Sequence, residues 1–529
     1  KAGFGWRDAP ISSSIFYPGN GILGREQIVK RASVCPNGCA AADVFRPGLS
    51  ALDYKYYNGF VGDTITASNL TINVGVRYDY QYGQNTASTV TGNPLFPDVV
   101  PGLNFAGSPV EFKWKTFQPR VGANYALGAD RKTLIRASYA RYADQLGGSI
   151  VSWDNPAGGA GLAGSRYVWT DKNGNHNVDP GELGAFIQDL GGFNHLNPNA
   201  LGSANQIDPN LKAPLTDEFQ LSFDREIIPE FAASITGTYR HRRRIIWSPY
   251  IGVSAASYTQ IFATGLPGYD VNGNLVGVTG PVFTGTLPDS FNSGEFVTNR
   301  PDYAQDYYGA QLQLTKRLTN KWMMHGSFAY NDWKQKISNK ATACVDPTNQ
   351  RLFEDPNLGP GFPTPNVGPS CSEGQLYNES SGSGNFGNVW INSHWSFNVS
   401  GLYQFPLNFN LAANFFGRQG YVNPLFVQVD TGNGEGTRGV LIGNATDNRL
   451  KNVYELDLRL EKTVPLFAKA DITLSLDLFN ALNSNTIMQR ESDATPSCDS
   501  SGKNCTGTAG KIDEVQNARA VRVGARISF

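Results

Sequence analysis

The sequence has no long apolar run. None of its uninterrupted hydrophobic stretches approaches the ~20 residues that a membrane-spanning helix needs, and its mean hydropathy is −0.32. Charged residues are scarce at 17%, below the value of about 25% that is usual in soluble domains. The net charge is −1. These features exclude a helical membrane protein and give no reason to expect nucleic acid as a partner.

Catalytic motifs are also absent from the sequence. It has only five histidines, with no HExxH spacing, no Gly-x-Ser-x-Gly turn and no GxxxxGK phosphate loop. Catalytic residues scattered over a barrel rim are the alternative, and His325 or His394 could belong to such a group. A histidine within a hydrogen-bond network is far commoner, so we expect no enzymatic activity.

What the chain does contain is a period-two alternation of apolar and polar residues. In its last ten residues, Val521, Val523 and Ile527 share one face of an extended strand, and Arg522 and Arg526 share the other. The alternation recurs near 70–82, 218–224, 395–405, 454–461 and 471–478. Such a strand fits between lipid and a polar lumen, but it also fits a soluble sandwich.

The lengths of the connections decide between these two architectures. We predict fourteen strands, near 1–8, 55–67, 69–82, 117–126, 132–142, 216–227, 231–242, 303–318, 321–333, 393–405, 408–417, 450–462, 468–481 and 518–529. From the second strand onward, short turns alternate strictly with long loops, the latter near 83–116, 143–215, 243–302, 334–392, 418–449 and 482–517. Barrels of the outer membrane have short periplasmic turns and long extracellular loops. The sequence therefore predicts an all-β fold, a transmembrane antiparallel up-and-down barrel with long extracellular loops.

The predicted strands also have a suitable length. Residues 395–405 span roughly 34 Å along the strand, or roughly 26 Å across the membrane at a tilt of about 40°. Trp322 and Tyr330 would mark the two aromatic rims on the neighbouring strand, because each ring is apolar with one polar tip. Ordinary aromatic pairing between strands is the alternative.

The six cysteines form three close pairs, all in predicted loops on one side of the barrel and none in a predicted strand. Neighbouring pairs indicate disulfides in an oxidising space, such as the exterior of a bacterium with two membranes. A metal site is the alternative, but the pairs are far apart and no histidine accompanies them at ligand spacing. The predicted disulfides are Cys35–Cys39, Cys344–Cys371 and Cys498–Cys505.

The segment DKNGNHNVDPGE has the ligand spacing of a calcium-binding EF-hand loop. Oxygen ligands fall at positions 1, 3, 5, 7, 9 and 12, the seventh through its backbone carbonyl: Asp171, Asn173, Asn175, Asn177, Asp179 and Glu182. His176 replaces the usual glycine, and residues 166–170 before the loop read as a strand. We expect a short helix at 182–190 and a structural calcium ion. An Asn-Gly turn without an ion is the alternative.

Two sets of charged residues have predicted roles at the rim and in the lumen. A basic run at the outer end of one strand is expected to contact lipopolysaccharide phosphates, or alternatively an anionic substrate at the mouth: Arg240, Arg242, Arg243 and Arg244. Residues predicted to face the lumen are expected to pair as a wall network rather than form a transport path: Arg77, Asp79, Asp457, Arg459 and Asp477.

Several strands resemble TonB-dependent receptors of the Oar-like group. The segments are LTINVGVRYDYQ (70–81), FQPRVGANYAL (117–127), TLIRASYARYAD (133–144), ELDLRLEK (455–462) and LSLDLFNALNSNT (474–486). The terminal strand ending in Phe529 is similar to the signal by which such barrels are recognised for insertion. The resemblance implies a barrel of about 22 strands around an N-terminal plug, preceded by a box that binds TonB. It implies that residues 1–529 are one domain, the C-terminal part of the barrel, with the plug and first strands missing. A closed barrel of fourteen strands is the alternative.

The function that the resemblance implies is uptake of a ligand across the outer membrane, whether siderophore, peptide or glycan. The expected partners are outer-membrane lipid and lipopolysaccharide, the TonB complex through the missing N-terminal part, and a surface lipoprotein. Two alternatives remain open: an adhesion or structural protein whose large loops bind a partner, and a passive porin.

Overall fold

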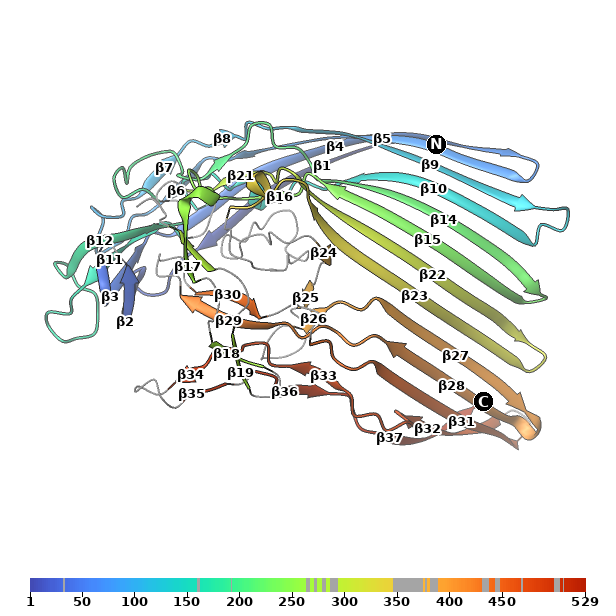
Figure 1. Cartoon of the computed structure of the whole chain (residues 1–529). Helices are drawn as coiled ribbons and strands as arrows, with labels where there is room; N and C mark the ends of the chain where they lie inside the picture. The colour runs from blue at the N-terminus through green and yellow to red at the C-terminus, as the bar shows by residue number, and fades with distance from the viewer. Residues whose placement is uncertain are drawn as a thin grey trace.

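One antiparallel sheet forms the frame of the molecule in the computed structural model (Figure 1). The structure describes residues 1–529 except 32–33, 159–161, 192, 263–266, 271–273, 278–281, 286–293, 346–373, 376–377, 381–388, 431–436, 443–447, 468–469, 499–504 and 508. Within this described part, no helix has the length and apolar character needed to cross a membrane.

The main sheet has 16 strands, of which fourteen long ones follow one another in chain order. They are β1 (Ala2–Ile15), β4 (Gly48–Ala67), β5 (Leu70–Asn85), β9 (Trp114–Leu127), β10 (Thr133–Ala143), β14 (Leu215–Ile228), β15 (Phe231–Arg243), β22 (Tyr303–Thr319), β23 (Trp322–Ile337), β27 (Trp395–Phe405), β28 (Phe409–Arg418), β31 (Val453–Phe467), β32 (Ala470–Phe479) and β37 (Ala520–Ser528). All fourteen predicted strands are confirmed. Several extend further at the loop end: β4 begins at Gly48 and β1 continues to Ile15, because these two strands stay paired there.

Short turns and long loops lie at opposite ends of the strands, as predicted (Figure 1). Asn320 and Lys321 form the whole connection between β22 and β23, with φ of 52° and 69°. Positive φ at both central residues is what a type I′ turn requires, and this turn matches the twist of paired strands. The long connections leave the other end and carry the small sheets.

The two faces of the sheet differ in chemistry. On the outer face of β14, β15 and β37, Leu221, Ile235 and Val523 are 61%, 56% and 78% exposed. Their chain neighbours Gln220 and Ser234 fall on the inner face, because side chains alternate along a strand. An exposed apolar surface of this extent fits lipid rather than water.

Two rows of aromatic rings border the apolar band. At the loop end, ring centroids are 4.7 Å apart for Tyr139 and Phe219 and 5.1 Å apart for Tyr239 and Tyr308. The row continues across the sheet through Tyr330, His394, Trp395, Phe397, Phe415 and Tyr454. At the turn end, Phe231 lies 6.5 Å from Trp322. Tyr239 and Phe231 are about 27 Å apart along β15, or roughly 21 Å across the membrane at a tilt of about 40°, slightly less than the apolar band of about 25 Å. Trp322 and Tyr330 therefore mark opposite rims, as predicted.

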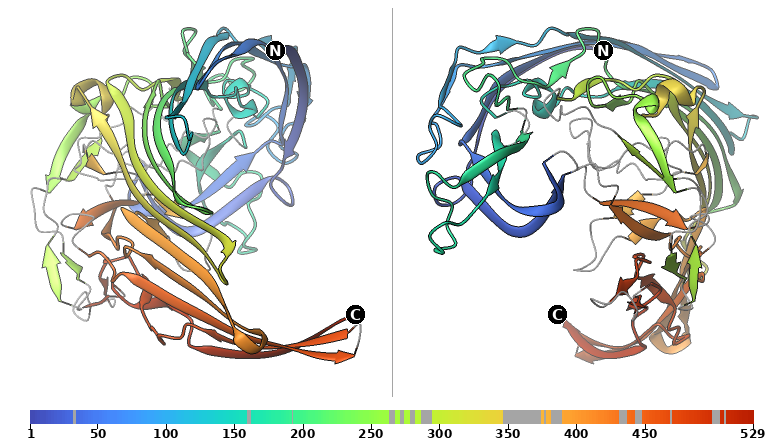
Figure 2. Two further views of the ribbon diagram at one scale, coloured as in Figure 1. Left: turned by 90° about the vertical axis from the view of Figure 1, so that its right-hand side faces the viewer. Right: turned by 60° about the vertical axis from the view of Figure 1, so that its left-hand side comes forward.

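The sheet curves into a trough whose end strands lie far apart (Figure 2). β1 pairs with β4 and β37 with β32. Among the described residues neither end strand has a second neighbour, so the sheet is open between them.

The remaining elements are short and most lie at the loop end. They are β2 (Ile22–Arg31), β3 (Cys35–Phe45), β6 (Ser88–Val90), β7 (Leu103–Phe105), β8 (Ser108–Pro109), α1 (Gly148–Val151), β11 (Gly164–Trp169), β12 (Leu183–Leu190), β13 (Gln206–Ile207), β16 (Ile246–Trp247), η1 (Ala255–Ser257), β17 (Tyr258–Phe262), β18 (Pro267–Tyr269), β19 (Leu275–Gly277), β20 (Val282–Gly285), β21 (Phe296–Asn299), α2 (Lys340–Ala343), β24 (Gly374–Gln375), β25 (Asn378–Ser380), β26 (Val389–Ile391), η3 (Pro406–Asn408), β29 (Leu425–Asp430), β30 (Thr437–Ile442), β33 (Ile487–Arg490), β34 (Ser497–Cys498), β35 (Cys505–Thr506) and β36 (Ile512–Val515).

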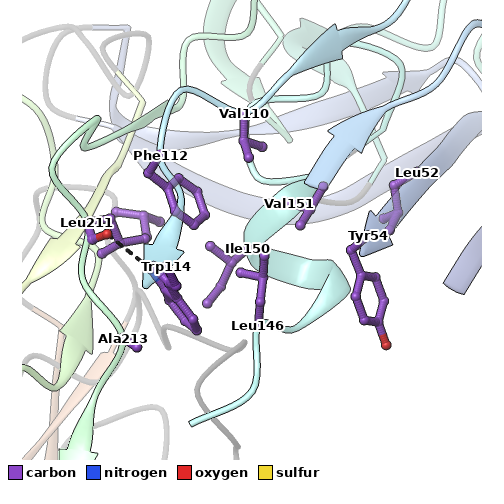
Figure 3. Packing of buried hydrophobic residues seen from close by; sticks show 11 residues of the cluster. Leu52, Tyr54, Val110, Phe112, Trp114, Leu146, Ile150, Val151, Leu211 and Ala213 are labelled. Atoms are coloured by element: carbon purple, nitrogen blue, oxygen red, sulfur yellow. Dashed lines mark hydrogen bonds between the residues drawn. The ribbon is translucent and has the colours of Figure 1, made fainter. Parts of the chain in front are cut away.

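An apolar core fills the inner face of the sheet at the loop end (Figure 3). Leu146 and Ile150, from α1 and the chain before it, lie on the side of Phe112 and of Trp114, the first residue of β9, whereas Val151 lies toward Leu52. The indole Nε1 of Trp114 donates to the carbonyl oxygen of Leu211 at 3.1 Å. The loops are thus folded against the sheet rather than extended from it.

The lipid-facing assignment can be tested with two neighbouring residues of β15. Ile235 lies midway between the aromatic rows on the outer face, and Ser234 lies on the inner face. We expect Ile235→Arg to lower the free energy of unfolding in phospholipid vesicles by about 2–4 kcal/mol, the cost of arginine at the bilayer midplane. Ser234→Arg should cost less than half as much in the same denaturant titration. Equal losses would show that the two faces are not lipid and lumen.

Candidate functional site

The charged side chains of the inner wall are paired with one another. Arg77 Nε lies 2.7 Å from Asp79 Oδ1, and Gln118 also donates to Asp79. Arg459 lies 3.2 Å from Asp477 and 2.6 Å from Glu461. The predicted wall network is confirmed for these residues. Asp457 differs, since it accepts the backbone N–H of Asn480 at 2.9 Å.

The basic run near the outer end of β15 is divided between the two faces of the sheet. Arg240 pairs with Glu218 and Arg242 with Asp144 on the inner face. The alternate residues lie on the outer face, where His241 contacts Asp306 at 2.8 Å and Arg243 contacts Asp217 at 3.1 Å. The run is therefore not one continuous basic patch.

Polar wall residues hold a loop against the inside of the sheet. Gln81 Oε1 accepts the N–H of Leu146 at 2.7 Å, and its Nε2 donates to the carbonyl of Asp144 at 3.2 Å. Gln118 Oε1 accepts the N–H of Ala143 at 3.3 Å. Together with the core of Figure 3, these contacts place folded chain over the inner face of β4, β5 and β9 at the mouth.

A hollow of about 440 Å³ lies among the loops at this end. Its walls include Trp247, Tyr250, Phe296 and Cys344. The indole Nε1 of Trp247 is buried, with no hydrogen-bond partner among the described residues. An apolar hollow with a free donor can accept a ligand that has a flat apolar part and an acceptor.

Glu295 lies beside this hollow, next to Phe296 and bridged to Tyr250. Its Oε2 is buried without a hydrogen-bond partner in the part of the chain that is described. Burial raises the pKa of the Glu295 carboxyl to about 7, against a smaller opposing effect of a hydrogen bond from Ser248. The group therefore changes charge near neutral pH.

The predicted calcium loop holds its shape by internal hydrogen bonds. Asp171 accepts the N–H groups of Gly174 and His176 at 2.8 and 2.9 Å. Asp179 Oδ2 accepts the side-chain amides of Asn173 and Asn175 at 2.9 and 2.7 Å. His176, at the position where glycine is usual, has a φ of 59° and takes the left-handed conformation. Asn177 donates its N–H to Asn175 Oδ1 at 2.7 Å.

Glu182 is the residue that fits a calcium site least well. Its carboxylate accepts from Trp169 Nε1 at 3.1 Å and from the N–H of Lys172 at 2.9 Å. The backbone N–H groups of Lys172 and of His176 lower the pKa of Glu182 and of Asp171, respectively. Among the described residues, no three His, Cys, Asp or Glu side chains form a group that could hold a metal. Asparagine oxygens would have to complete the ligand set.

The segment that leaves this loop is a strand. The prediction of a helix at 182–190 is wrong: β12 pairs with β11, which pairs in turn with β3. The predicted strand at 166–170 is confirmed by β11. The edge of β11 offers unpaired backbone groups to 183–190, and pairing there replaces the local hydrogen bonds of a short helix.

The structure bears out part of the disulfide prediction. Cys35 and Cys39 form a disulfide, and Cys344 is disulfide-bonded. Cys371 lies outside the described residues, so the Cys344–Cys371 pair stays a prediction. Cys498 and Cys505 are directly opposite each other in β34 and β35. The expectation that no cysteine lies in a strand is wrong, because Cys35 and Cys39 belong to β3.

We expect the calcium loop to bind weakly, with a dissociation constant of about 1 mM, as in extracellular modules with few carboxylates. Calorimetric titration of the purified protein with calcium chloride should show binding that Asp179→Asn abolishes. Asp270→Asn, in the loop between β18 and β19, is the matched control and should leave binding unchanged. A flat titration up to several millimolar would rule the site out.

The raised pKa of Glu295 predicts a pH-dependent stability around the hollow. The carboxyl ionises near pH 4.5 in the unfolded chain and near 7 in the folded one. Stability is therefore full below about pH 4.5 and falls as the pH rises towards 7, by about 3 kcal/mol in total. Hydrogen exchange should show protection of β13 and β21 falling between pH 5 and 8. Glu295→Gln should remove this fall and the exposed Glu514→Gln should not; unchanged protection in the native protein would contradict the assignment.

Comparison with solved structures finds only remote likenesses. The outer membrane transporter YddB from Escherichia coli is 11% identical, with 100% of this chain and 60% of that chain covered and a TM-score of 0.40. The siderophore receptor PiuA from Acinetobacter baumannii is 9% identical, with 91% and 45% covered and a TM-score of 0.40. The ferric yersiniabactin uptake receptor FyuA from Yersinia pestis is 11% identical, with 93% and 49% covered and a TM-score of 0.39. The chain spans about half the length of these proteins.

The family assignment rests on a different comparison. A search of curated proteins found no match. The family model described as "Outer membrane beta barrel domain" matches residues 41–361, which is more than half of the chain. This range includes strands β4 to β23 of the main sheet. The chain therefore belongs to the family of outer membrane beta barrel domains and resides in the outer membrane.

Proposed function

We propose that the chain is the C-terminal barrel part of a TonB-dependent receptor that takes up a ligand across the outer membrane. The observation that carries the proposal is the inner wall, which is polar and ion-paired beneath folded loops. A lumen lined in this way is suited to water and to a polar cargo. Because folded loops cover the mouth, we expect them to restrict which solutes enter the lumen.

The open edges of the sheet support the view that further strands complete the barrel. β1 and β37 each carry a row of backbone groups without a second neighbour among the described residues. In hydrocarbon every unsatisfied N–H or C=O costs several kcal/mol, so a spanning sheet must close on itself. We propose that strands outside residues 1–529 pair with both edges, and that a plug and a TonB-binding box belong to the same protein.

The class of cargo stays open between siderophore, peptide and glycan. The hollow beside Glu295 is the proposed first contact, because it combines aromatic walls with the unpaired indole donor of Trp247. We also propose that a surface lipoprotein is a partner of this protein. A calcium ion in the loop at 171–182 is likewise a proposal. A porin and an adhesion protein are the competing functions.

Uptake can be tested with the full-length protein and defined probes. Cells that produce it should accumulate one class among ⁵⁵Fe-loaded siderophores, labelled casein peptides and labelled oligosaccharides. A protonophore should abolish that accumulation, because TonB draws its energy from the inner membrane. Purified protein should give no steady conductance in planar bilayers. Steady conductance would identify a porin. Accumulation that the protonophore does not reduce would contradict energy coupling.

A further inference from the structure

Two arginines contact one carboxylate, that of Asp217, on the outer face of the sheet, and a third arginine follows directly in the chain. Arg141 Nε lies 2.7 Å from Asp217 Oδ1, and Arg243 lies 3.1 Å from Asp217 Oδ2. Arg244 comes directly after β15 with a φ of 60°, and its side chain lies close enough to Arg243, Arg141 and Asp217 to interact with their charges. With Tyr139, whose hydroxyl donates to Asp217 at 2.7 Å, these residues form what we call the rim cluster.

The rim cluster has an excess of two positive charges. Asp217 balances only one of Arg141, Arg243 and Arg244. Burial, and then the charges of Arg243 and Arg141, lower the pKa of Arg244, as expected for a cation held near others of its kind. The next group along the rim is more nearly balanced, since Asp306 contacts both His241 and Lys336. The excess charge is therefore larger in the rim cluster than in this neighbouring group.

An apolar groove lies directly below the rim cluster on the same face. A hollow of about 350 Å³ is lined by Arg141, Asp217 and His241 together with Tyr139, Phe219 and Tyr239. The same three aromatic residues also line a second hollow of about 650 Å³, which runs over Ala123, Ala137 and Gly237. The groove exists because small residues on β9, β10 and β15 leave a gap between larger ones, with Leu221 of β14 standing between Ala137 and Gly237. A charged hollow thus continues into an apolar one.

The position of these hollows identifies the kind of ligand. Both lie on the lipid-facing side, at the aromatic row of the loop end, where the headgroups of the outer leaflet meet the acyl chains. Guanidinium groups bind phosphate through paired N–H donors, and an acyl chain fits a groove of small apolar residues. A soluble anion entering the lumen would instead meet Arg240 and Arg242, which are already paired on the inner face.

We propose that the rim cluster and the groove together bind a phosphorylated lipid of the outer leaflet, with lipopolysaccharide as the occupant. A phosphate sits against Arg141, Arg243 and Arg244, and one acyl chain lies over Gly237. Of the four arginines expected from the sequence to contact lipopolysaccharide, only Arg243 and Arg244 take this role, and Arg141 of the neighbouring hairpin joins them. The proposal rests on the outer-membrane location of the chain and is independent of uptake.

The phosphate contact can be tested by removing one arginine charge from the outer face of the sheet and, as a control, one from the inner face. Full-length protein purified from outer membranes would be titrated with rough-type lipopolysaccharide in detergent, and binding followed by native mass spectrometry. Arg244→Gln and Arg243→Gln should each weaken binding about tenfold, the scale of a lost charge-assisted contact. Arg240→Gln, on the inner face of the same strand, should change it less than twofold. Equal effects on the two faces would overturn the proposal.

The groove is tested separately with glycines that have room for a side chain. A Cβ at Gly237 or at Gly59 would meet no atom closer than a backbone oxygen 4.0 Å away, so both positions accept leucine. Gly237→Leu should weaken lipopolysaccharide binding at least fivefold on the same energetic scale, whereas Gly59→Leu, on the outer face of β4, should not. Heat-modifiable migration on gels would confirm that each variant is folded.

Two further probes distinguish the lipid from other anions. Dephosphorylated lipopolysaccharide should bind the native protein about as weakly as the Arg244→Gln variant binds the intact lipid. Inorganic phosphate at tens of millimolar should fail to compete. If inorganic phosphate competes and Gly237→Leu leaves lipopolysaccharide binding unchanged, the site binds free anions, and the lipid assignment is overturned.

Discussion

Backbone hydrogen bonding inside a hydrocarbon layer is the constraint on which the rest of this structure depends. A strand that crosses lipid has no water to satisfy its N–H and C=O groups, so each must pair with a neighbouring strand along its length. This requirement explains why fourteen strands pair in unbroken chain order and why their connections are either very short or confined to one end. It also makes the outer edges of β1 and β37 the places where the sheet must meet other strands.

Pairing of this kind fixes a register, and the register fixes the chemistry of each residue. In β15, Tyr239, His241 and Arg243 fall on the lipid side, while Arg240 and Arg242 fall on the lumen side. A run that looks uniformly basic in the sequence is thereby divided into a satisfied inner set and an outer set with excess charge. The outer set forms a charged cluster only together with residues of neighbouring strands, because Arg141 and Asp217 come from other strands.

The sequence was sufficient to predict the strands, the turns, the aromatic rims and the paired inner wall. Each of these follows from local alternation or from spacing along the chain. The loops could not be predicted in the same way, since their elements depend on contacts between distant segments. Residues 183–190 form a strand only because β11 offers an edge, and Cys35 and Cys39 lie in a strand because β3 pairs between β2 and β11.

Arg243 and Arg244 were expected from the sequence to contact lipopolysaccharide, but the part of the rim cluster that comes from other strands was missed, and so was the hollow beside Glu295, for different reasons. Arg141, Asp217 and Arg243 each lie two or four positions from an aromatic residue of the same face. That spacing was a signal, but without the register nothing indicated that the three residues meet. Glu295 gave no signal, because its burial results from packing of β13, β16 and β21. Local pattern predicts the membrane sheet, whereas tertiary packing determines the sites.

The pairing of the inner wall constrains where a cargo can be recognised. Arg77 and Arg459 face the lumen, yet each already contacts carboxylates of the same wall. To bind an anion, either arginine would first have to leave its carboxylate unpaired, which offsets much of the gain. A paired wall therefore presents dipoles rather than free charges, and a solute can move past it without being held. Among the described residues, the buried polar atoms without a hydrogen-bond partner include two at the mouth, the indole Nε1 of Trp247 and Oε2 of Glu295, where folded loops exclude water and strengthen polar contacts. From this contrast we infer that the loops, and not the paired wall, would recognise a cargo.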